Sequence, residues 1–523
     1  MSRIRVVGGS ITKTSKGATT IEVLDGNFVS IAAKQNIWNG GENGVTHHEY
    51  VAPEKKEEKP TDEEKVLDAK CIVQFRPSSG WGGQFGFDWF RTGDTGRKGD
   101  LSYETLIGQY YDKAVTDATK QINTNGNKWT ANFKADPQPT EFIAYNRIQK
   151  LKELYGIYKY SLGNDKSGNP VNKEYYKPVI ALFATEPDPL NQGKFIETGK
   201  AKLDLYIEFE QQGKKEIRPS KLIFEMDGVL MDEKHPLVSI DKHTILENKL
   251  KNKIEIEITC KAEFAADKDI KVWAISIDST GNQTAKLQAG VLKMIAPAKK
   301  RTKNIVVVLV KTSLGTGENK KIDTLKKNLK QALVKPNIVT EVSQNGILEE
   351  VTIDLTIASN NVYNTDFNTV FGVNSNKYGN ITKASRLEDT LLRTLSRDYP
   401  GQFDDHFKLF FFRNSYQMVL DSTTSEPISF TRGFSARNTN HGLMFWGHDE
   451  DTIAHECLHG LGLPHSFWGE STPNNTFCYQ AQKTDNIMDY SHNKVDIATG
   501  VEHSKTIDRI ATWYWQWKII NNL

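Results

Sequence analysis

The chain is 523 residues long, which predicts three or four domains at roughly 150 residues per domain. Hydrophobic residues make up 38% of the chain, a low share that is still compatible with globular domains. Its 67 lysines and arginines nearly balance its 65 aspartates and glutamates, which argues against a broad nucleic-acid-binding face, because such a face needs concentrated positive charge.

Residues 1–17 contain basic side chains but no continuous apolar stretch, so a secretory signal peptide is not predicted. The longest apolar run, residues 305–310, is far shorter than the roughly 20 residues of a membrane-spanning helix. We therefore expect synthesis in the cytoplasm, no membrane span, and secretion or injection by a route that does not read a cleaved signal.

The N-terminal part divides into a leader, a linker and a first domain. Residues 1–50 consist of short, glycine-punctuated β-like pieces, which we interpret as a leader or docking segment. Residues 51–65 (VAPEKKEEKPTDEEK) are charged and almost free of apolar side chains, as exposed linkers are. In residues 66–190, alternating apolar and polar positions predict a mostly β domain. Its expected elements include strands beginning at Cys71, a helix over 103–124, and strands over 130–137 and 179–189.

Residues 196–297 predict a second β domain. Apolar and polar residues alternate there with period two, and turn signals separate the alternating segments. This spacing is typical of a sandwich, so we expect an immunoglobulin-like β domain. The expected strands cover residues 203–210, 221–228, 253–264 and 269–282.

Residues 303–523 change to a mixed α/β pattern. Uninterrupted apolar runs indicate buried strands, whereas apolar residues at helical spacing indicate helices, the first of them stopped by Pro336. The expected order is strand 305–310, helix 321–334, strand 351–357, helix 386–398 and strand 406–413.

A C-terminal helix is expected to place Ile507, Ile510, Ala511, Tyr514 and Trp517 on one face. Trp513 and Trp515 are expected to pack in the core rather than on a carbohydrate or membrane surface.

The stretch DTIAHECLHGLGLPHS carries the strongest chemical signal. A helix would place His455 and His459 on one face, because they are four residues apart. Gly462 tolerates positive φ and lets the chain leave the helix, so that His465 can return as a third ligand. Three imidazoles suit a catalytic Zn²⁺ with an open position, and Glu456 could act as general base toward a metal-activated water. The alternative is an ordinary amphipathic helix with surface histidines.

HECLHGLGLPH fits the pattern HExxHxxGxxH, so residues 303–523 resemble the metzincin zinc endopeptidases. The resemblance implies an α/β metzincin-type catalytic domain that cleaves protein or peptide substrates. It also implies a methionine beneath the three histidines, and Met488 in TDNIMDYSH fits that position. Tyr490 occupies a position where a metzincin tyrosine can bind zinc and stabilise the transition state; the alternative is a packed aromatic. By the same analogy, an edge strand within residues 433–446 would pair with an extended peptide.

The N-terminal pieces VVGGSITKTSKG, GNFVSIAAKQNI and NGVTHHEY resemble leaders of type VI secretion cargo, and FRPSSGWGGQFGFDWFRTGD resembles a stretch of such effectors. This resemblance covers roughly residues 1–190. It implies a toxin-like effector delivered by a contractile injection system, with tube or spike proteins and an immunity protein as partners. The alternatives are generic β modules for adhesion or spacing, and a structural or cargo-binding component of the apparatus whose protease domain only processes or is vestigial.

The four cysteines are sparse and show no CxxC spacing, so a disulfide framework is not expected. A bridge between Cys457 and Cys478 stays open, and Cys71 is expected in a core strand rather than as a latency ligand of the metal. Other histidines could bind metal or line the cleft but lack ligand spacing of their own: His47, His48, His441, His448, His492 and His503.

Overall fold

The structure is a computed structural model, and the residues that it describes all belong to one compact unit of the chain. The predicted leader, the predicted linker and the predicted strand over 130–137 lie outside the described residues. The described residues are 66–68, 70–112, 140–144, 148–164, 167–212, 215–319, 321–344, 346–360, 363–467, 477–492 and 507–521.

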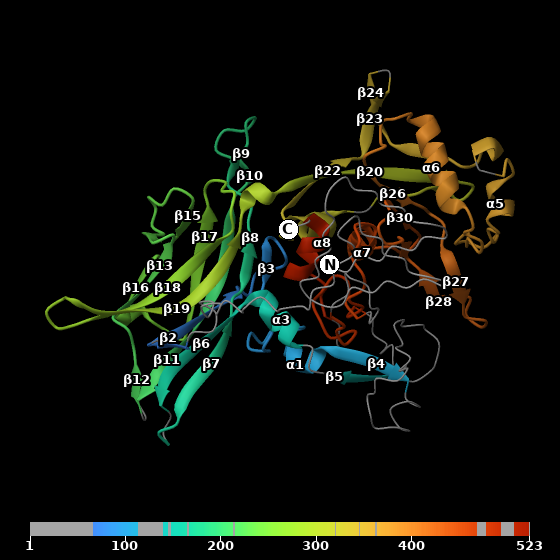
Figure 1. The fold of residues 1–523 in the computed structure, drawn as a ribbon. Coiled ribbons are helices and arrows are strands. Elements are labelled where there is room, and N and C mark those ends of the chain that lie inside the picture. The colour runs from blue at the N-terminus through green and yellow to red at the C-terminus, as the bar shows by residue number, and fades with distance from the viewer. Residues whose placement is uncertain are drawn as a thin grey trace, which may run out of the picture. The chain divides into compact units, whose positions relative to one another are not determined.

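Two sheets dominate the N-terminal half of the described chain (Figure 1). The first has the order β1-β6-β11-β17-β15, with β2, β7 and β12 paired beside it. The second has the order β14-β13-β18-β19-β8-β3, with β16 paired to β13. The strands of the first sheet are β1 Val66–Asp68, β2 Cys71–Pro77, β6 Ile157–Asn164, β7 Pro170–Tyr176, β11 Lys200–Gln212, β12 Lys215–Ile217, β15 Val238–Ile240 and β17 Lys253–Cys260. Those of the second are β3 Gly86–Asp88, β8 Val179–Ala181, β13 Lys221–Met226, β14 Val229–Leu230, β16 Thr244–Leu246, β18 Lys268–Ile277 and β19 Gln283–Ile295.

The alternation read from the sequence reappears as alternating burial. Every second residue of β13 is buried, because successive side chains of a strand point to opposite faces. The two sheets bury these faces against each other, and the rings of Phe75 and Phe224 meet edge to face with centroids 6.4 Å apart. The four expected strands between residues 203 and 282 are confirmed as β11, β13, β17 and β18.

The predicted boundary near residue 190 falls between strands that share sheets. β2 lies antiparallel to β11, with Phe75 opposite Leu205. β8 lies parallel to β19, with Ile180 opposite Met294. Residues 66–190 and 196–297 therefore contribute strands to the same two sheets.

The helix predicted over residues 103–124 is wrong. The observed helix α1 covers only Tyr103–Leu106, and strand β4, Gly108–Asp112, follows it. Ile107 is extended and forms a bridge with Tyr479, while the amide of Gly108 donates to the carbonyl of Cys478 at 3.0 Å. Pairing with a distant segment thus ends the helix where local propensity favours its continuation.

A third, mostly parallel sheet lies in the C-terminal half, with the order β21-β20-β26-β30-β29 and with β22 and β25 also paired to β20. Its central run of apolar residues in β20 is buried on both faces, as expected for parallel strands covered by helices. One side of the run packs with α4 and α7. The other side packs with α5 and α6, which are labelled in Figure 1. The strands are β20 Arg301–Thr312, β21 Gly315–Thr316, β22 Val334–Val339, β25 Thr352–Asp354, β26 Phe407–Phe411, β29 Gly433–Phe434 and β30 His441–Met444. The helices of this half are α4 Asp323–Gln331, α5 Phe367–Val370, α6 Leu387–Asp398, α7 Glu450–Gly460 and α8 Tyr514–Asn521, whereas α3, Ile148–Tyr155, belongs to the N-terminal half.

Two sequence predictions need correction in this half. The helix expected over 321–334 ends at Gln331, and Pro336 lies inside strand β22, which pairs only with β20 among the described strands. Such an edge position tolerates proline. The expected C-terminal helix begins only at Tyr514, because Ala511 is held in an extended bridge with Asn486.

The expected core packing of the two C-terminal tryptophans is confirmed. Trp513 and Trp515 are 1% and 8% exposed, as expected of core residues. Among the described residues, no helix combines the length and the apolar character needed to cross a membrane.

Small hairpins complete the described fold. They are β4 with β5 Thr140–Ala144, β9 Glu186–Pro187 with β10 Phe195–Glu197, β23 Glu341–Gln344 with β24 Ile347–Glu350, and β27 Tyr416–Leu420 with β28 Pro427–Thr431.

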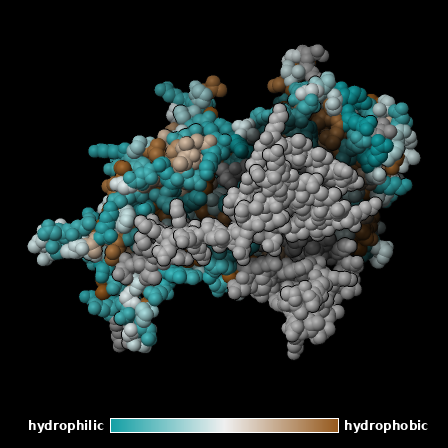
Figure 2. All heavy atoms as spheres, viewed as in Figure 1, coloured by the Kyte–Doolittle hydropathy of each residue, from teal (hydrophilic) through white to brown (hydrophobic). Residues whose placement is uncertain are grey.

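On the face drawn in Figure 2, hydrophilic residues cover most of the visible surface of the strand-rich part, and hydrophobic residues appear as small separate spots. Most apolar side chains of this part belong to the buried core.

Candidate metal centre

Helix α7 carries the first half of the site. Its N-terminus is capped by Asp449, whose carboxylate accepts from the amide of Thr452 at 2.8 Å, a standard way to satisfy the first amides of a helix. The helix ends at Gly460, and Gly462 follows with φ of +102°. A side chain at Gly462 would also lie 2.7 Å from the amide oxygen of Asn438. The chain therefore turns back sharply at a position where only glycine fits the backbone conformation and the surroundings.

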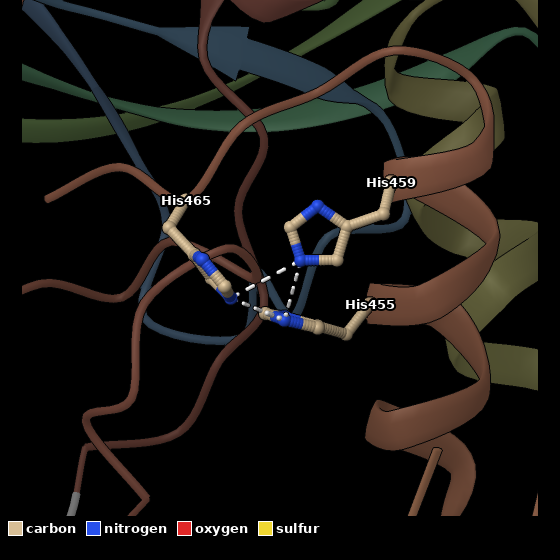
Figure 3. Close-up of side chains that lie close together, drawn as sticks. All are labelled: His455, His459 and His465. Atoms are coloured by element: carbon tan, nitrogen blue, oxygen red, sulfur yellow. Dashed lines mark hydrogen bonds between the residues drawn. The ribbon is translucent and has the colours of Figure 1, made fainter. Parts of the chain in front are cut away.

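This turn brings three histidines together. His455 and His459 project from α7, and His465 approaches from the segment after the turn (Figure 3). The Nε2 atom of His455 lies 3.0 Å from that of His459 and 3.1 Å from that of His465. The Nε2 atoms of His459 and His465 are also 3.1 Å apart. All three side chains are buried.

The hydrogen bonds of the rings fix where their protons are. The Nδ1 atom of His455 lies 2.9 Å from the carbonyl oxygen of Ile487, and that of His459 lies 2.7 Å from the carbonyl oxygen of Leu463. A carbonyl can only accept, so each Nδ1 carries the proton and each Nε2 presents a lone pair. Partners of this kind orient the histidine ligands of metal ions.

The charge state of the histidines also suits a metal ion. Burial, together with the neighbouring rings and Arg509, lowers the pKa of His455 and His465 well below the usual value, and burial lowers the pKa of His459 to about 4. The rings are therefore neutral at pH 7, and the facing Nε2 lone pairs of His455 and His459 cannot hydrogen-bond to each other. Together with His465, these two histidines could hold a metal ion.

Glu456 follows the first histidine and is held by a neighbouring edge strand. Its half-buried carboxylate accepts a hydrogen bond from the amide of Ser435. A side chain on Gly433, in β29, would come within 2.7 Å of the Cγ atom of Glu456, so glycine is needed there. Burial raises the pKa of Glu456 to about 8, against the opposing effects of Ser435 and Arg509.

Tyr490 lies beside the histidines. Its ring centroid is 4.9 Å from that of His465 and 5.8 Å from that of His455. Burial, followed by the charge of Glu456, raises the pKa of its phenol, which therefore stays protonated at neutral pH. The ring also packs against Phe467, so the position agrees both with a packed aromatic and with a hydrogen-bond donor at the site.

The loop over residues 484–489, hereafter the floor loop, supports the histidines through its main chain. Its Ile487 carbonyl is the partner of His455, and the carbonyl of Met488 accepts from the amide of Ser466, next to His465. Met488 itself is fully buried. The sequence-predicted residues His455, Glu456, His459, His465, Gly462, Met488 and Tyr490 are thus brought into one neighbourhood.

The other candidate residues have separate roles. The Nε2 atom of His441 lies 2.7 Å from the carboxylate of Glu388 in α6, and Nδ1 of His448 lies 2.7 Å from the carbonyl oxygen of Phe445. The ring of His492 lies 6.2 Å from that of Tyr490. All four cysteines, Cys71 and the pair left open in the sequence among them, are buried free thiols. His47, His48 and His503 lie outside the described residues.

Three buried charged residues near the floor loop escaped the sequence interpretation. Arg509 lies with Nη1 3.4 Å from the carbonyl oxygen of Asp489 and with Nη2 3.6 Å from the carboxylate of Asp451. Arg91 and Asp485 form a buried ion pair across 394 residues of sequence. No local pattern marks such residues, although Arg91 stands within the stretch FRPSSGWGGQFGFDWFRTGD.

Comparison with known proteins adds little. No family model matches the chain, and no curated protein matches it. A solved structure of WR4, a C. elegans MSP family member, aligns with 23% of this chain and 91% of its own length, at 12% sequence identity and a TM-score of 0.14. At that TM-score the alignment carries no argument about fold or function.

Proposed function

We propose that the chain is a zinc-dependent endopeptidase of the metzincin type. His455, His459 and His465 would hold the metal, and Glu456 would act as general base. The observation that carries this proposal is the convergence of three neutral, buried imidazoles through their Nε2 atoms, next to a carboxylate on the helix that carries two of them.

The donor set favours zinc over other ions. Imidazole nitrogen also suits copper, iron and nickel, but three histidines with an open fourth position are typical of catalytic zinc sites. The tetrahedral geometry and Zn–N distance of about 2.0–2.1 Å place ligand nitrogens roughly 3.3 Å apart, close to the 3.0–3.1 Å found between the Nε2 atoms. When bound, zinc would polarise the scissile carbonyl and acidify the attacking water.

The chain's own residues would supply the other catalytic groups. The charge of a bound metal ion would favour the ionised form of Glu456 and oppose the effect of burial on its pKa. Glu456 would then take a proton from the attacking water and deliver it to the leaving amine, with its carboxylate oriented by the amide of Ser435. The phenol of Tyr490, protonated at neutral pH, would donate a hydrogen bond to the developing oxyanion. Strand β29 pairs only with β30 among the described strands, and an extended substrate could pair with its other edge.

The finer fold assignment belongs to the same proposal. We assign the two packed sheets to an immunoglobulin-like sandwich and residues 303–523 to an α/β metzincin-type domain. The support is the antiparallel pairing of β11, β13, β17 and β18, and the parallel sheet covered by helices on both faces.

The proposed biological role is that of an effector or toxin delivered by a contractile, type VI-like injection system. Its support is the resemblance of residues 1–190 to such cargo. The full chain is expected to co-purify with tube or spike proteins, whereas a chain lacking residues 1–65 is not. Equal recovery of both chains would remove the docking role of the leader, and failure of both would remove the delivery proposal.

Metal content and proteolysis, measured on wild type beside Glu456→Ala, test the peptidase proposal. One zinc per chain in both proteins, with a peptide library cut only by wild type, is the expected result. Full activity of Glu456→Ala would exclude the proposed general base. Absence of zinc from both would exclude the metallopeptidase and favour the alternative of a structural or cargo-binding component with a vestigial protease domain.

A further inference from the structure

The floor loop holds a metal ligand but has little regular structure of its own. Its Ile487 carbonyl accepts the Nδ1 proton of His455, and the amide of Met488 donates to the side chain of Asn486 at 2.9 Å. The position of His455 therefore depends on what holds the residues just before Ile487, because a shift of that carbonyl would release the ring.

One residue that holds the start of this loop is Arg91, from the strand-rich region. Its Nη1 atom lies 3.2 Å from the carboxylate of Asp485, and the two side chains are only 2% and 3% exposed. The guanidinium also stacks on Trp89, with 3.5 Å between its carbon and the ring centroid. Among the described residues, neither Nε nor Nη2 of Arg91 has a hydrogen-bond partner. The pair to Asp485 is thus its one direct ionic contact there.

A buried pair of this kind constrains both partners. Removing either charge leaves the other buried without compensation. Other charged groups act on Arg91 through space, namely Asp88 and Asp100, but neither forms an ion pair with it. The contact with Asp485 is therefore the main electrostatic interaction that stabilises the buried guanidinium of Arg91.

The backbone around Arg91 also packs on the floor loop. Gly99 has φ of +83°, and a side chain there would come within 2.6 Å of the amide nitrogen of Asp485. On the other side, the carbonyl of Asp485 accepts from the amides of Ile510 and Ala511, at 2.9 Å each. Asp485 is therefore fixed from three directions, and its side chain is fixed by Arg91.

We propose that Arg91 is a positioning residue of the metal centre, which acts through Asp485 to keep the Ile487 carbonyl against His455. The inference rests on the proposed function, since it presumes that the three histidines bind a metal ion. It assigns a role to the strand-rich region beyond docking or spacing: this region completes the support of a site whose ligands all come from the other end of the chain.

The test measures metal binding by the full chain. Zinc affinity is obtained by competition with a chelator, and the visible spectrum of bound Co²⁺ reports the geometry of the ligands. We expect Arg91→Met and Asp485→Asn each to weaken zinc binding and to change the Co²⁺ spectrum. The loss should be at most the roughly 10- to 100-fold typical of losing a direct partner of a ligand, because both residues act on His455 only through the Ile487 carbonyl. The double variant should bind zinc no more weakly than whichever single variant has the lower zinc affinity, because both substitutions remove the same contact.

The matched control is Arg76→Met. Arg76 is also a buried arginine paired with an aspartate, Asp94, but both residues belong to the strand-rich region. This variant should lose stability and keep wild-type zinc affinity. A lower melting temperature of Arg91→Met with unchanged zinc affinity and Co²⁺ spectrum would overturn the proposal. Failure of wild type itself to bind zinc would instead overturn the proposed function.

A measurement on wild type decides the question if Arg91→Met does not fold. Added zinc should slow amide hydrogen exchange both in the floor loop and in residues 86–100, because coupling between two sites is reciprocal. Slower exchange in the floor loop alone would show that the segment around Arg91 is independent of the metal centre and would overturn the proposal.

Discussion

The strand-rich region, residues 66–295, and the helix-containing region, residues 301–521, bury different kinds of side chain. In the first, most strand residues that point inward are apolar, and charged pairs such as Lys200 with Glu257 stay on the surface. In the second, many amide, hydroxyl and imidazole groups are buried. Several buried polar residues of the first region, Asp88 and Arg91 among them, contact the second.

The difference follows from how each region satisfies its backbone. In paired strands the backbone amides and carbonyls hydrogen-bond to the neighbouring strand, so the side chains need not supply hydrogen-bond partners for them. The loops around the metal centre have no such ladder, and buried backbone groups must find partners elsewhere. Gln331 shows this: its side chain donates to the carbonyls of Gly83 and Ile510 and accepts from the amide of Thr512. Irregular backbone near the candidate metal centre is thus held by buried polar side chains.

The largest expected effect comes from separating the two regions. One hydrophobic cluster contains residues of both, from Cys71 in β2 to Trp517 in α8. Residues 301–523 expressed alone would expose the part of that cluster covered by the first region and are expected not to fold. Circular dichroism should show a cooperative thermal transition for residues 62–523 and none for residues 301–523. A cooperative transition of the shorter chain, with wild-type zinc affinity, would show that the regions are independent.

The next effect concerns Gln331. Replacement by leucine keeps a similar volume but leaves the carbonyls of Gly83 and Ile510 and the amide of Thr512 without their partner. We expect a loss of at least about 3 kcal/mol in the free energy of unfolding, since each of the three buried unsatisfied groups costs about 1–3 kcal/mol. Urea denaturation of Gln331→Leu and wild type measures it. A loss below about 1 kcal/mol would mean that these buried polar contacts matter less than proposed here.

A smaller, pH-dependent effect is expected from Asp88. Burial raises the pKa of its carboxyl to about 6, although Arg91, Tyr155 and the amides of Tyr514 and Trp89 oppose the shift. The folded pKa therefore lies above the ordinary value of 3.8, so the folded state binds the proton more tightly than the unfolded state. This contribution stabilises the fold at low pH and is lost as pH rises from about 4 to about 6, by roughly 2–3 kcal/mol.

Asp88→Asn removes this titration. The stability advantage of wild type over the variant should therefore be larger at pH 4 than at pH 7, by about that amount. Unfolding free energies of both proteins across this range measure the difference. An advantage that does not change with pH would contradict the raised pKa of Asp88.

The smallest effect is expected for the exposed pair of Lys200 and Glu257, whose side chains are 52% and 27% exposed and whose charged atoms are 2.6 Å apart. Exposed pairs contribute about 0–1 kcal/mol. Lys200→Ala should therefore change the free energy of unfolding by less than about 1 kcal/mol, and added salt should reduce that change. A loss as large as that of Gln331→Leu would abolish the distinction between the two regions.

The sequence by itself determined the features that depend on local spacing. Alternation of apolar residues identified β13 and its neighbours, because side chains of a strand alternate between faces. The four-residue spacing of His455 and His459 identified one face of a helix, and Gly462 identified the turn that returns His465. The residues of each pattern lie close together in the sequence, so the pattern can be recognised without knowledge of the rest of the chain.

Only the tertiary structure decided the features that depend on distant partners. Local propensity favours a helix beyond Leu106, but pairing of Ile107 with Tyr479 ends it. The spacing in the sequence does not show that β2 and β8 share sheets with later strands, or that Arg91 faces Asp485. The physical reason is that a buried charge or an unpaired strand needs a partner, while the sequence near it does not specify which distant residue the fold will bring there.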